Sequence, residues 1–279
     1  MADFIINAFA DESSSDLLGQ IDALRRNNLQ GLEIRNVNGK NIADYTLDDI
    51  KEFGKIIENN GFNVWSIGSR LGKIKITDDF LPHLDEFKKT IEIAHILKAD
   101  HIRLFSFYMP KDEDPTPYRD EVLERMAKFI ETAKGSGVKL CHENEKGIYG
   151  DIAPRCLEIH KALPELGGIF DPANFIQCEQ NTMEAWELLH NYITYMHIKD
   201  CLADGKVVPA GKGVGNLPEI LKMFKAEGGK ALTLEPHLSI FKGLAGLERE
   251  GEKSQIGAFQ YASKEEAFDV AVASLRAII

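Results

Sequence analysis

Short apolar segments alternate with longer amphipathic segments along the whole chain. Eight of the short segments are rich in β-branched and aromatic residues, as strands are, and they lie at residues 4–9, 31–37, 62–67, 101–107, 138–143, 168–171, 194–199 and 231–236. Between them, apolar residues recur at spacings of three and four, as at Leu17, Ile21 and Leu24. That spacing places them on one face of a helix. The pattern therefore predicts strands that alternate with helices.

Helix-start signals support this alternation. Thr46 followed by Asp49, and Ser263 followed by Glu266, have the spacing of a capping box. Pro218 lies where a first helical turn tolerates proline. We therefore expect helices to begin at these three places.

Strands separated by a helix are expected to lie parallel, because a tight hairpin cannot span such a gap. Eight strand and helix units predict a closed (β/α)8 TIM barrel. A doubly wound open sheet is the structural alternative, but it usually has fewer strands, and residues 9–12 lack a GxGxxG phosphate turn. No linker or change of composition divides the chain. We expect residues 1–279 to form one barrel domain.

Two predicted connections are longer than a barrel requires. Residues 107–118 follow the fourth strand, and residues 238–262 follow the eighth. Both would leave the barrel at its C-terminal face, where the active sites of barrels lie. We expect them to act as lids or oligomer contacts, and the second loop fits solvated surface decoration equally well.

The charge balance excludes some kinds of partner. Lys and Arg number 33 against 44 Asp and Glu, which gives a formal charge of −11, and no run of Lys or Arg forms a basic face. Such a chain repels a polyanion, so no nucleic-acid partner is expected. No apolar stretch reaches the roughly 20 residues of a membrane span, and the N-terminus lacks signal-peptide features. We expect a cytoplasmic protein without a membrane partner.

Four potential metal ligands stand at the ends of four consecutive predicted strands. Glu143 ends the fifth strand, Asp171 ends the sixth, His197 lies in the seventh and Glu235 ends the eighth. Because the C-terminal ends of barrel strands meet at one mouth, we expect these residues to be neighbours in space. Taken alone, each carboxylate is more often a salt-bridge partner or a helix cap, and a lone histidine is more often structural. Their shared position on successive strands favours one common site.

Three carboxylates packed together repel one another unless a cation neutralises them or they retain protons. One imidazole with three carboxylates offers mostly oxygen donors, which favours Mn²⁺, Mg²⁺ or Co²⁺ and tolerates Zn²⁺ or Fe²⁺. The sequence therefore predicts one divalent metal ion, bound by Glu143, Asp171, His197 and Glu235.

The segments around these ligands resemble the xylose-isomerase-like superfamily of sugar-phosphate isomerases and epimerases. They are LCHENEKG at 140–147, FDPANF at 170–175, HIKD at 197–200 and LEPH at 234–237, and the resemblance extends to residues 33–35, 66–73 and 102–105. It implies a divalent-metal site made from the four predicted ligands. In the ketose epimerases of this superfamily, the glutamates that match Glu143 and Glu235 also act as acid and base on either side of the substrate carbon.

This assignment of roles agrees with simple chemistry. A metal bound by a carbonyl and an adjacent hydroxyl acidifies the neighbouring C–H and stabilises the enediolate. Glutamates on opposite faces of that carbon can remove a proton from one side and return it from the other. We expect a metal-dependent isomerase or epimerase of a sugar or sugar-like hydroxyketone that works by proton transfer through a metal-stabilised enediolate.

Three cationic residues are expected at the same mouth. Arg35, Arg103 and Lys73 lie on or after the second, fourth and third predicted strands. They would hold a phosphate or polarise a sugar oxygen of the carbohydrate substrate. The alternative is that they only pair with nearby acids, which are Asp11, Glu12 and Glu33.

Four more residues are predicted substrate contacts: Glu145, Asn174, Lys199 and His237. Glu145 and His237 each lie two residues beyond a predicted ligand and share its side if the strand continues. Many members of the superfamily have His where this chain has Asn174, and an amide cannot exchange protons near neutral pH. Lys199 would reach a substrate oxyanion or the rim carboxylates, with a salt bridge to Asp200 as the alternative.

A glycine-rich loop at residues 209–216 follows the seventh predicted strand and contains Lys212. Barrels often bind phosphate after this strand, so the loop could cradle an anion. It lacks the Gly-Lys-Ser/Thr ending of a nucleotide P-loop.

Three other functions fit parts of the same pattern. A keto-cyclitol dehydratase would use the same enediolate to expel a hydroxyl, and a non-catalytic sugar-binding barrel would keep the ligands without turnover. The apurinic-site endonuclease branch of the superfamily works on DNA with three zinc ions and needs more histidine ligands than His197, and the charge of −11 opposes it. Barrels of this superfamily often pair through their mouth loops, so a homo-oligomer stays open.

Overall fold

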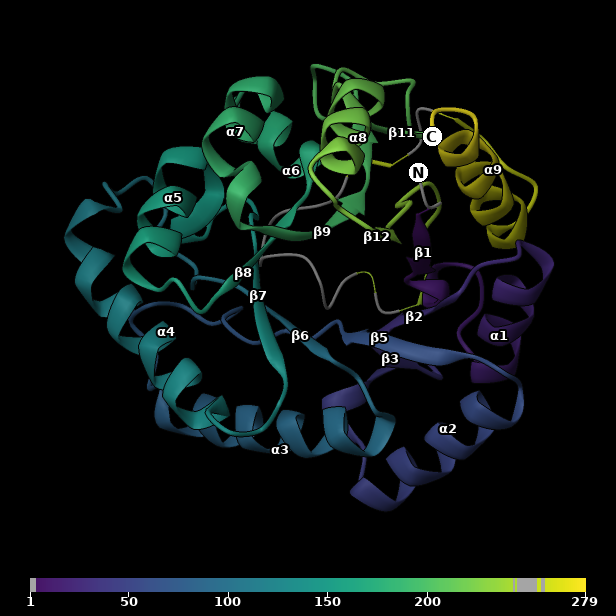
Figure 1. The fold of residues 1–279 in the computed structure, drawn as a ribbon, viewed down its shortest axis with the longest axis horizontal. Coiled ribbons are helices and arrows are strands. Elements are labelled where there is room, and N and C mark those ends of the chain that lie inside the picture. Colours follow the sequence, from purple (N-terminus) through teal and green to yellow (C-terminus); the bar gives the residue numbers. More distant parts are fainter. Residues whose placement is uncertain (1–3, 243, 245–254, 257–258) are drawn as a thin grey trace.

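A closed barrel of parallel strands forms the centre of the computed structural model, which describes residues 4–242, 244, 255–256 and 259–279 (Figure 1). Its strands are β1 (Ile5–Ala8), β2 (Gly31–Ile34), β5 (Asn63–Ile67), β6 (His101–Leu104), β7 (Lys139–Glu143), β8 (Gly167–Phe170), β9 (Ile193–Ile198) and β12 (Ala231–Leu234). They pair in this order, and β12 pairs with β1 to close the ring. The predicted (β/α)8 barrel is confirmed, and the open sheet is excluded. That residues 1–279 form one domain stays a prediction.

Helices surround the barrel on its outer side (Figure 1). They are α1 (Leu17–Arg26), α2 (Leu47–Asn59), α3 (Leu81–Leu97), α4 (Arg119–Ala133), α5 (Ala153–Ala162), α6 (Pro172–Gln177), α7 (Thr182–Leu189), α8 (Leu217–Ala226) and α9 (Lys264–Arg276). An ion pair between Arg26 and Asp269, at 2.8 Å, joins the first helix to the last. Within the described ranges, no helix has both the length and the apolar content needed to cross a bilayer.

Shorter elements connect these units. Single-turn 3₁₀ helices lie at Ala10–Glu12, Ile42–Asp44, Thr116–Tyr118, Tyr149–Asp151 and His190–Tyr192. Two small hairpins also form, one from β3 (Asn36–Val37) and β4 (Lys40–Asn41), the other from β10 (Asp200–Cys201) and β11 (Val207–Val208). Both hairpins follow barrel strands, so they lie at the end of the barrel where the strands terminate.

The helices turn their apolar stripes toward the barrel. Leu17, Ile21 and Leu24 of α1 are all buried, as their spacing predicted. Pro218 lies in the first turn of α8. Burial of such stripes supplies most of the stabilisation of helices on a barrel.

Of the two predicted capping boxes, one forms as predicted and the other differs in one hydrogen bond. Thr46 and Asp49 form a complete capping box at the start of α2. Ser263 accepts the backbone N–H of Glu266, but the Glu266 carboxylate binds the N–H of Ala262. The second cap therefore extends one residue further back than its spacing predicted.

The two long connections leave the barrel at the C-terminal ends of the strands. Tyr108, in the first, forms a β-bridge with Ile148. In the second, Phe241 is buried, and residues 243, 245–254 and 257–258 lie outside the described residues. Their roles as lids or oligomer contacts stay predictions.

The glycine-rich loop binds a carboxylate of its own chain. Asp200 accepts hydrogen bonds from the backbone N–H groups of Gly211, Gly213 and Gly215 at 2.9, 3.0 and 3.0 Å. A Cβ at Gly213 would lie 2.3 Å from Asp200 Oδ1, so this close approach requires glycine. The expectation of an external anion is corrected, because these amides already bind Asp200.

We expect Asp200→Ala to destabilise the fold by about 2 kcal/mol, because it leaves one buried and two part-buried glycine amides without their acceptor. Urea denaturation would measure the change. Asp204→Ala is the matched control, since Asp204 lies in the same hairpin, is half exposed and pairs with the half-exposed Lys206. Equal stability of the two variants would contradict a structural role for Asp200.

Candidate metal centre

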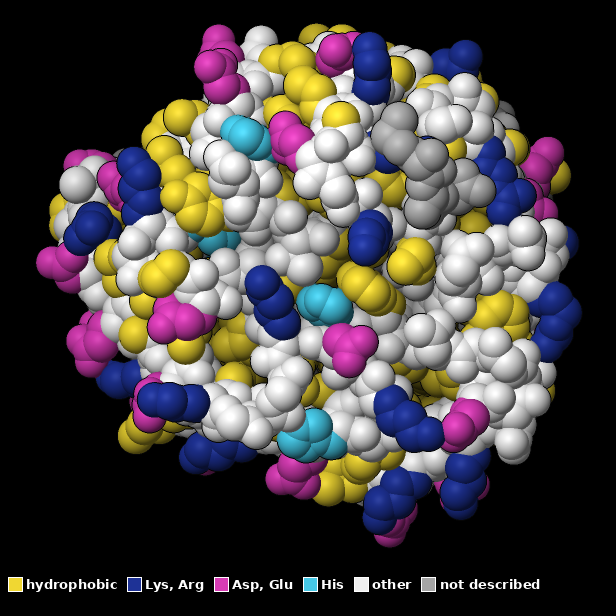
Figure 2. All heavy atoms as spheres, in the orientation of Figure 1, with side chains coloured by type: hydrophobic (Ala, Val, Ile, Leu, Met, Phe, Trp, Pro, Cys, Tyr) yellow, Lys and Arg dark blue, Asp and Glu magenta, His cyan; other side chains and the backbone are white. Residues whose placement is uncertain are grey.

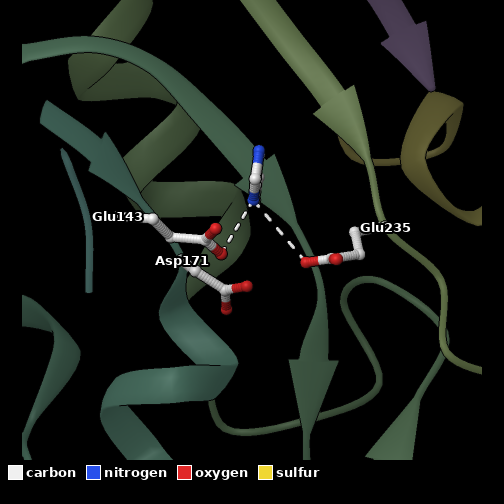
Figure 3. A group of neighbouring side chains, drawn as sticks. Glu143, Asp171 and Glu235 are labelled. Carbon is white, nitrogen blue, oxygen red and sulfur yellow. Dashed lines mark hydrogen bonds and ion pairs between the residues drawn. The ribbon is translucent and has the colours of Figure 1, made fainter. Parts of the chain in front are cut away.

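Four side chains from neighbouring strands meet at the C-terminal mouth of the barrel. Glu143 ends β7, Asp171 follows β8 and caps α6, His197 lies in β9, and Glu235 follows β12. All four are buried, and one ligand atom of each lies within 4.8 Å of the others. Figure 3 shows the three carboxylates around one imidazole nitrogen. That the four bind a metal ion stays a prediction.

The distances define a common volume. His197 Nδ1 lies 2.9 Å from Glu143 Oε1 and 3.6 Å from Glu235 Oε2. Asp171 Oδ1 accepts the backbone N–H of Asn174 at 3.0 Å, which fixes the carboxylate at the start of α6. One nitrogen and three carboxylate groups facing one volume form a donor set that suits a divalent ion.

The second carboxylate oxygen of Glu143 and that of Glu235 each accept a hydrogen bond from an arginine. Glu143 Oε2 accepts from Arg103 at 3.0 Å, and Glu235 Oε1 accepts from Arg35 at 2.7 Å. Both guanidinium groups are buried, so the ion pairs are shielded from solvent. The structure thus places both arginines beside the predicted ligands, and their contact with substrate stays a prediction.

Phe9 packs against both arginines. Its ring centroid lies 4.2 Å from Arg35 Cζ and 4.8 Å from Arg103 Cζ, and its ring stands nearly perpendicular to that of His197. A Cβ at Gly68 would lie 2.5 Å from the Phe9 ring, so glycine leaves the space that this ring occupies. Phe9 was not predicted as a site residue, although its position at the end of the first predicted strand was an available signal.

Lys199 lies between two of the carboxylates. Its Nζ is 2.8 Å from Asp171 Oδ2 and 3.2 Å from Glu235 Oε2. The alternative of a salt bridge with Asp200 is therefore wrong, and the reason is that the glycine-rich loop holds the Asp200 carboxylate. Contact of Lys199 with a substrate stays a prediction.

Two other predicted contacts lie further out, whereas Asn174 is buried beside a predicted ligand. Lys73 and Glu145 pair with each other at 3.0 Å and are partly exposed. The Asn174 amide lies 3.4 Å from Glu143 Oε1. Figure 2 shows cationic, acidic and histidine side chains near the centre of the face that the helices surround. Their roles in substrate binding stay predictions.

A second group of ligand-type atoms adjoins the first and comprises Glu12, Glu235 and His237. His237 has a φ of 46°, so β12 has ended before it, yet its Nε2 lies 3.7 Å from Glu235 Oε1. The facing oxygens of Glu12 and Glu235 bind Arg35 at 2.8 and 2.7 Å, so a guanidinium occupies the place of a second cation. No further group of this kind occurs among the described residues. A three-zinc centre has no counterpart there.

More acids than bases are buried around this centre. The acids are Asp11, Glu12, Glu33, Glu143, Asp171 and Glu235, and the Lys and Arg residues are Arg35, Arg103 and Lys199. Burial raises the pKa of Glu12 to about 8, against the attraction of Arg35. A divalent ion would neutralise most of the remaining excess of buried negative charge. Both the charge of the site and its donor atoms therefore fit such an ion.

The pKa values of the predicted ligands reflect the same excess of buried acidic groups. Burial raises the pKa of Asp171 to about 7. Burial acts the same way on Glu143, but His197 and Arg103 outweigh it and lower its pKa to about 2. Burial also opposes the charge of His197, yet Glu143 and Glu33 hold its pKa well above the usual value. Without a metal, the centre therefore retains protons at neutral pH.

A buried network below the ligands was not predicted from the sequence. Glu33, on β2, accepts from the Tyr195 hydroxyl at 2.9 Å and lies 3.0 Å from His197 Nε2. Burial and the Glu33 carboxylate raise the pKa of Tyr195 well above its usual value, so the phenol remains a donor. Glu33 was considered only as an ion-pair partner. Its position two residues before Arg35, on the same side of β2, was the available signal.

Comparison with known proteins identifies the class. The family model described as xylose isomerase-like TIM barrel matches residues 21–254, and the chain belongs to this family. No curated protein matches the chain.

Solved structures of similar fold share low identity with this chain. The probable 3-DHS dehydratase AsbF from Bacillus anthracis is 14% identical over 99% of both chains, with a TM-score of 0.74. An IOLI protein with a bound zinc atom is 15% identical over 98% of this chain and 99% of that chain, with a TM-score of 0.73. The 3-keto-D-glucoside 4-epimerase YcjR from E. coli is 15% identical over the same shares, with a TM-score of 0.72. At such identities the likeness shows the fold alone.

We expect the affinity for a divalent ion to rise with pH across neutrality. The ion must displace protons from Asp171, whose pKa is about 7, and from His197. The association constant should therefore increase by about tenfold per pH unit for each proton displaced. Calorimetric titration with Mn²⁺ between about pH 6 and about pH 8 measures this, and buffers of different ionisation enthalpy count the protons. Equal affinity across that range would contradict the expectation.

Proposed function

We propose that this protein is a divalent-metal-dependent isomerase or epimerase of a sugar or a sugar-like hydroxyketone. One observation carries the proposal: Glu143 and Glu235 approach one point from opposite sides (Figure 3). An arginine binds one oxygen of each. The family and a fold neighbour that is an epimerase support the same class.

The proposed metal ligands are Glu143, Asp171, His197 and Glu235. When bound, a divalent ion would polarise the substrate carbonyl and stabilise negative charge on its oxygen. The oxygen-rich donor set favours Mn²⁺, Mg²⁺ or Co²⁺. The same donors are also compatible with Zn²⁺, and the zinc atom in the IOLI structure supports this.

Glu143 and Glu235 are the proposed catalytic residues. One removes a proton from the carbon beside the carbonyl, and the other returns a proton from the opposite face, which inverts that carbon. Return to the neighbouring carbon would instead interconvert aldose and ketose. Because Arg35 and Arg103 hold the outer oxygens, the inner oxygens keep a fixed direction toward the reacting carbon.

The remaining polar groups of the mouth are proposed to bind substrate hydroxyls. They are Arg35, Lys73, Arg103, Glu145, Asn174, Lys199 and His237. In the described part of the chain, each Lys and Arg of this set already pairs with a carboxylate. Such pairs accept neutral hydroxyl groups more readily than a doubly charged phosphate. An unphosphorylated substrate is therefore expected.

A keto-cyclitol dehydratase is the second candidate. Lys199 Nζ lies 3.2 Å from Glu235 Oε2, so a buried cation stands beside a proposed base and could protonate a departing hydroxyl. The fold neighbour AsbF carries the description of a probable dehydratase. The two reactions differ in product mass, because only the dehydratase releases water.

Deuterium exchange tests the proton step. The metal-loaded protein would be incubated in D₂O with ketoses, aldoses and keto-cyclitols, and we expect deuterium beside a carbonyl of the converted compound. Glu143→Gln and Glu235→Gln should each lower turnover by about 10²- to 10⁴-fold, because an amide cannot accept the proton. NMR and mass spectrometry of the products measure both effects, with metal content determined for each variant.

Glu131→Gln is the control, because Glu131 is exposed on α4 and should leave turnover unchanged. Turnover without deuterium would indicate a hydride shift and contradict the mechanism. Loss of water would favour the dehydratase, and binding of metal and sugar without any product would favour a non-catalytic barrel.

Chelation of the metal should abolish turnover and lower the melting temperature, because a ligand of the folded state stabilises that state. Addition of Mn²⁺ should restore both. Activity assays and thermal denaturation of the same samples measure this. Turnover that survives thorough chelation would rule out metal dependence.

A further inference from the structure

Glu33 is a buried carboxylate whose ion pair is with a histidine rather than with a lysine or an arginine. Glu143 and Glu235 each bind an arginine, whereas the ion pairs of the described residues give Glu33 only the imidazole of His197 and no Lys or Arg. A buried carboxylate without a strong cation is unfavourable unless its oxygens accept good hydrogen bonds. Its contact with His197 therefore needs an explanation.

The two oxygens of Glu33 have separate contacts. Oε2 lies 3.0 Å from His197 Nε2, and Oε1 accepts from the Tyr195 hydroxyl at 2.9 Å. The Tyr195 hydroxyl in turn lies 3.1 Å from Ser66 Oγ. The carboxylate is thus held from below and directed at one imidazole nitrogen.

The opposite nitrogen of that imidazole faces the other predicted ligands. His197 Nδ1 lies 2.9 Å from Glu143 Oε1, on the mouth side of the ring. An imidazole binds a metal only through a nitrogen that carries no proton. If Nε2 keeps its proton and donates it to Glu33, Nδ1 presents its lone pair to the mouth.

Packing holds the ring in this orientation. The ring centroid of His197 lies 5.3 Å from that of Phe9, edge to face, and 5.6 Å from that of Tyr195. A half-turn of the ring would place carbons where the two nitrogens lie, so the contacts with Glu33 and with Glu143 would both be lost. The Glu33 contact therefore selects both the tautomer and the orientation.

We propose that Glu33 is a positioning residue that holds the Nε2 proton of His197, so that Nδ1 binds the divalent ion of the mouth. This inference rests on the proposed function, because it assumes the metal site. Glu33 itself touches neither metal nor substrate.

Glu33→Gln keeps the size of the side chain and removes its charge. We expect it to lower the Zn²⁺ association constant by about 10- to 100-fold, as loss of a carboxylate behind a ligating histidine typically does. Tyr195→Phe should cause a smaller loss in the same direction, because Glu33 keeps its contact with His197. Ser66→Ala is the matched control, since Ser66 is buried in the same network without contacting His197, and should bind Zn²⁺ as the unmodified protein does. Competition titrations with a chelator measure all three.

A direct measurement on the unmodified protein covers the case in which a variant fails to fold. In the zinc-loaded protein with ¹⁵N-labelled histidine, NMR should show a slowly exchanging proton on Nε2 of His197 and the zinc-induced shift on Nδ1. A proton on Nδ1, or a Glu33→Gln variant with unchanged zinc affinity and an unchanged Nε2 proton signal, would overturn the role of Glu33 and leave the proposed function standing. An unmodified protein that binds no divalent ion would overturn both.

Discussion

Excess negative charge, buried at one point, is the constraint on which this site depends. Glu143, Asp171 and Glu235 come from different strands and meet where desolvation makes neighbouring carboxylates unfavourable. Arg35 and Arg103 do not remove the problem, because they bind the outer oxygens of the glutamates. The inner oxygens face one volume together with a nitrogen of imidazole, and Lys199 contacts Asp171 and Glu235 there but not Glu143. A metal ion resolves this arrangement better than protons do, because only the ion can use all four groups at once.

Chain order and strand period made much of this predictable. A parallel barrel brings the C-terminal ends of its strands together whatever the loops do, so Glu143, Asp171, His197 and Glu235 could be placed near one another from strand assignments alone. Asp171 had a further local reason, since a residue that ends a strand and precedes Pro172 suits the cap of the next helix. The function of these residues does not follow from the same geometry.

Contacts across the barrel could not be predicted in the same way. Glu33 and His197 are separated by most of the chain, and only side-chain conformation decides that they meet. The partners of Lys199 show the same limit, because Asp200 is its neighbour in sequence while Asp171 and Glu235 are its neighbours in space. Alternating glycines predicted a cradle of amides correctly. Which anion fills it depended on the hairpin of β10 and β11, which turns Asp200 beneath the loop.

If the proposed function holds, groups outside the four predicted ligands would decide between isomerisation and loss of water. Strand ends place these ligands, and segments after the strands supply what lies over them: Phe241 packs 4.9 Å from Arg35 Cζ and stacks on His237. A proton that returns to carbon needs only the two glutamates, whereas a departing hydroxyl also needs a donor close to its oxygen. Lys199, held between Asp171 and Glu235, can serve as that donor only if the substrate lies with a hydroxyl toward it. Under the proposed function, the pose imposed by the residues over the mouth would therefore determine which of the two reactions Glu143 and Glu235 catalyse.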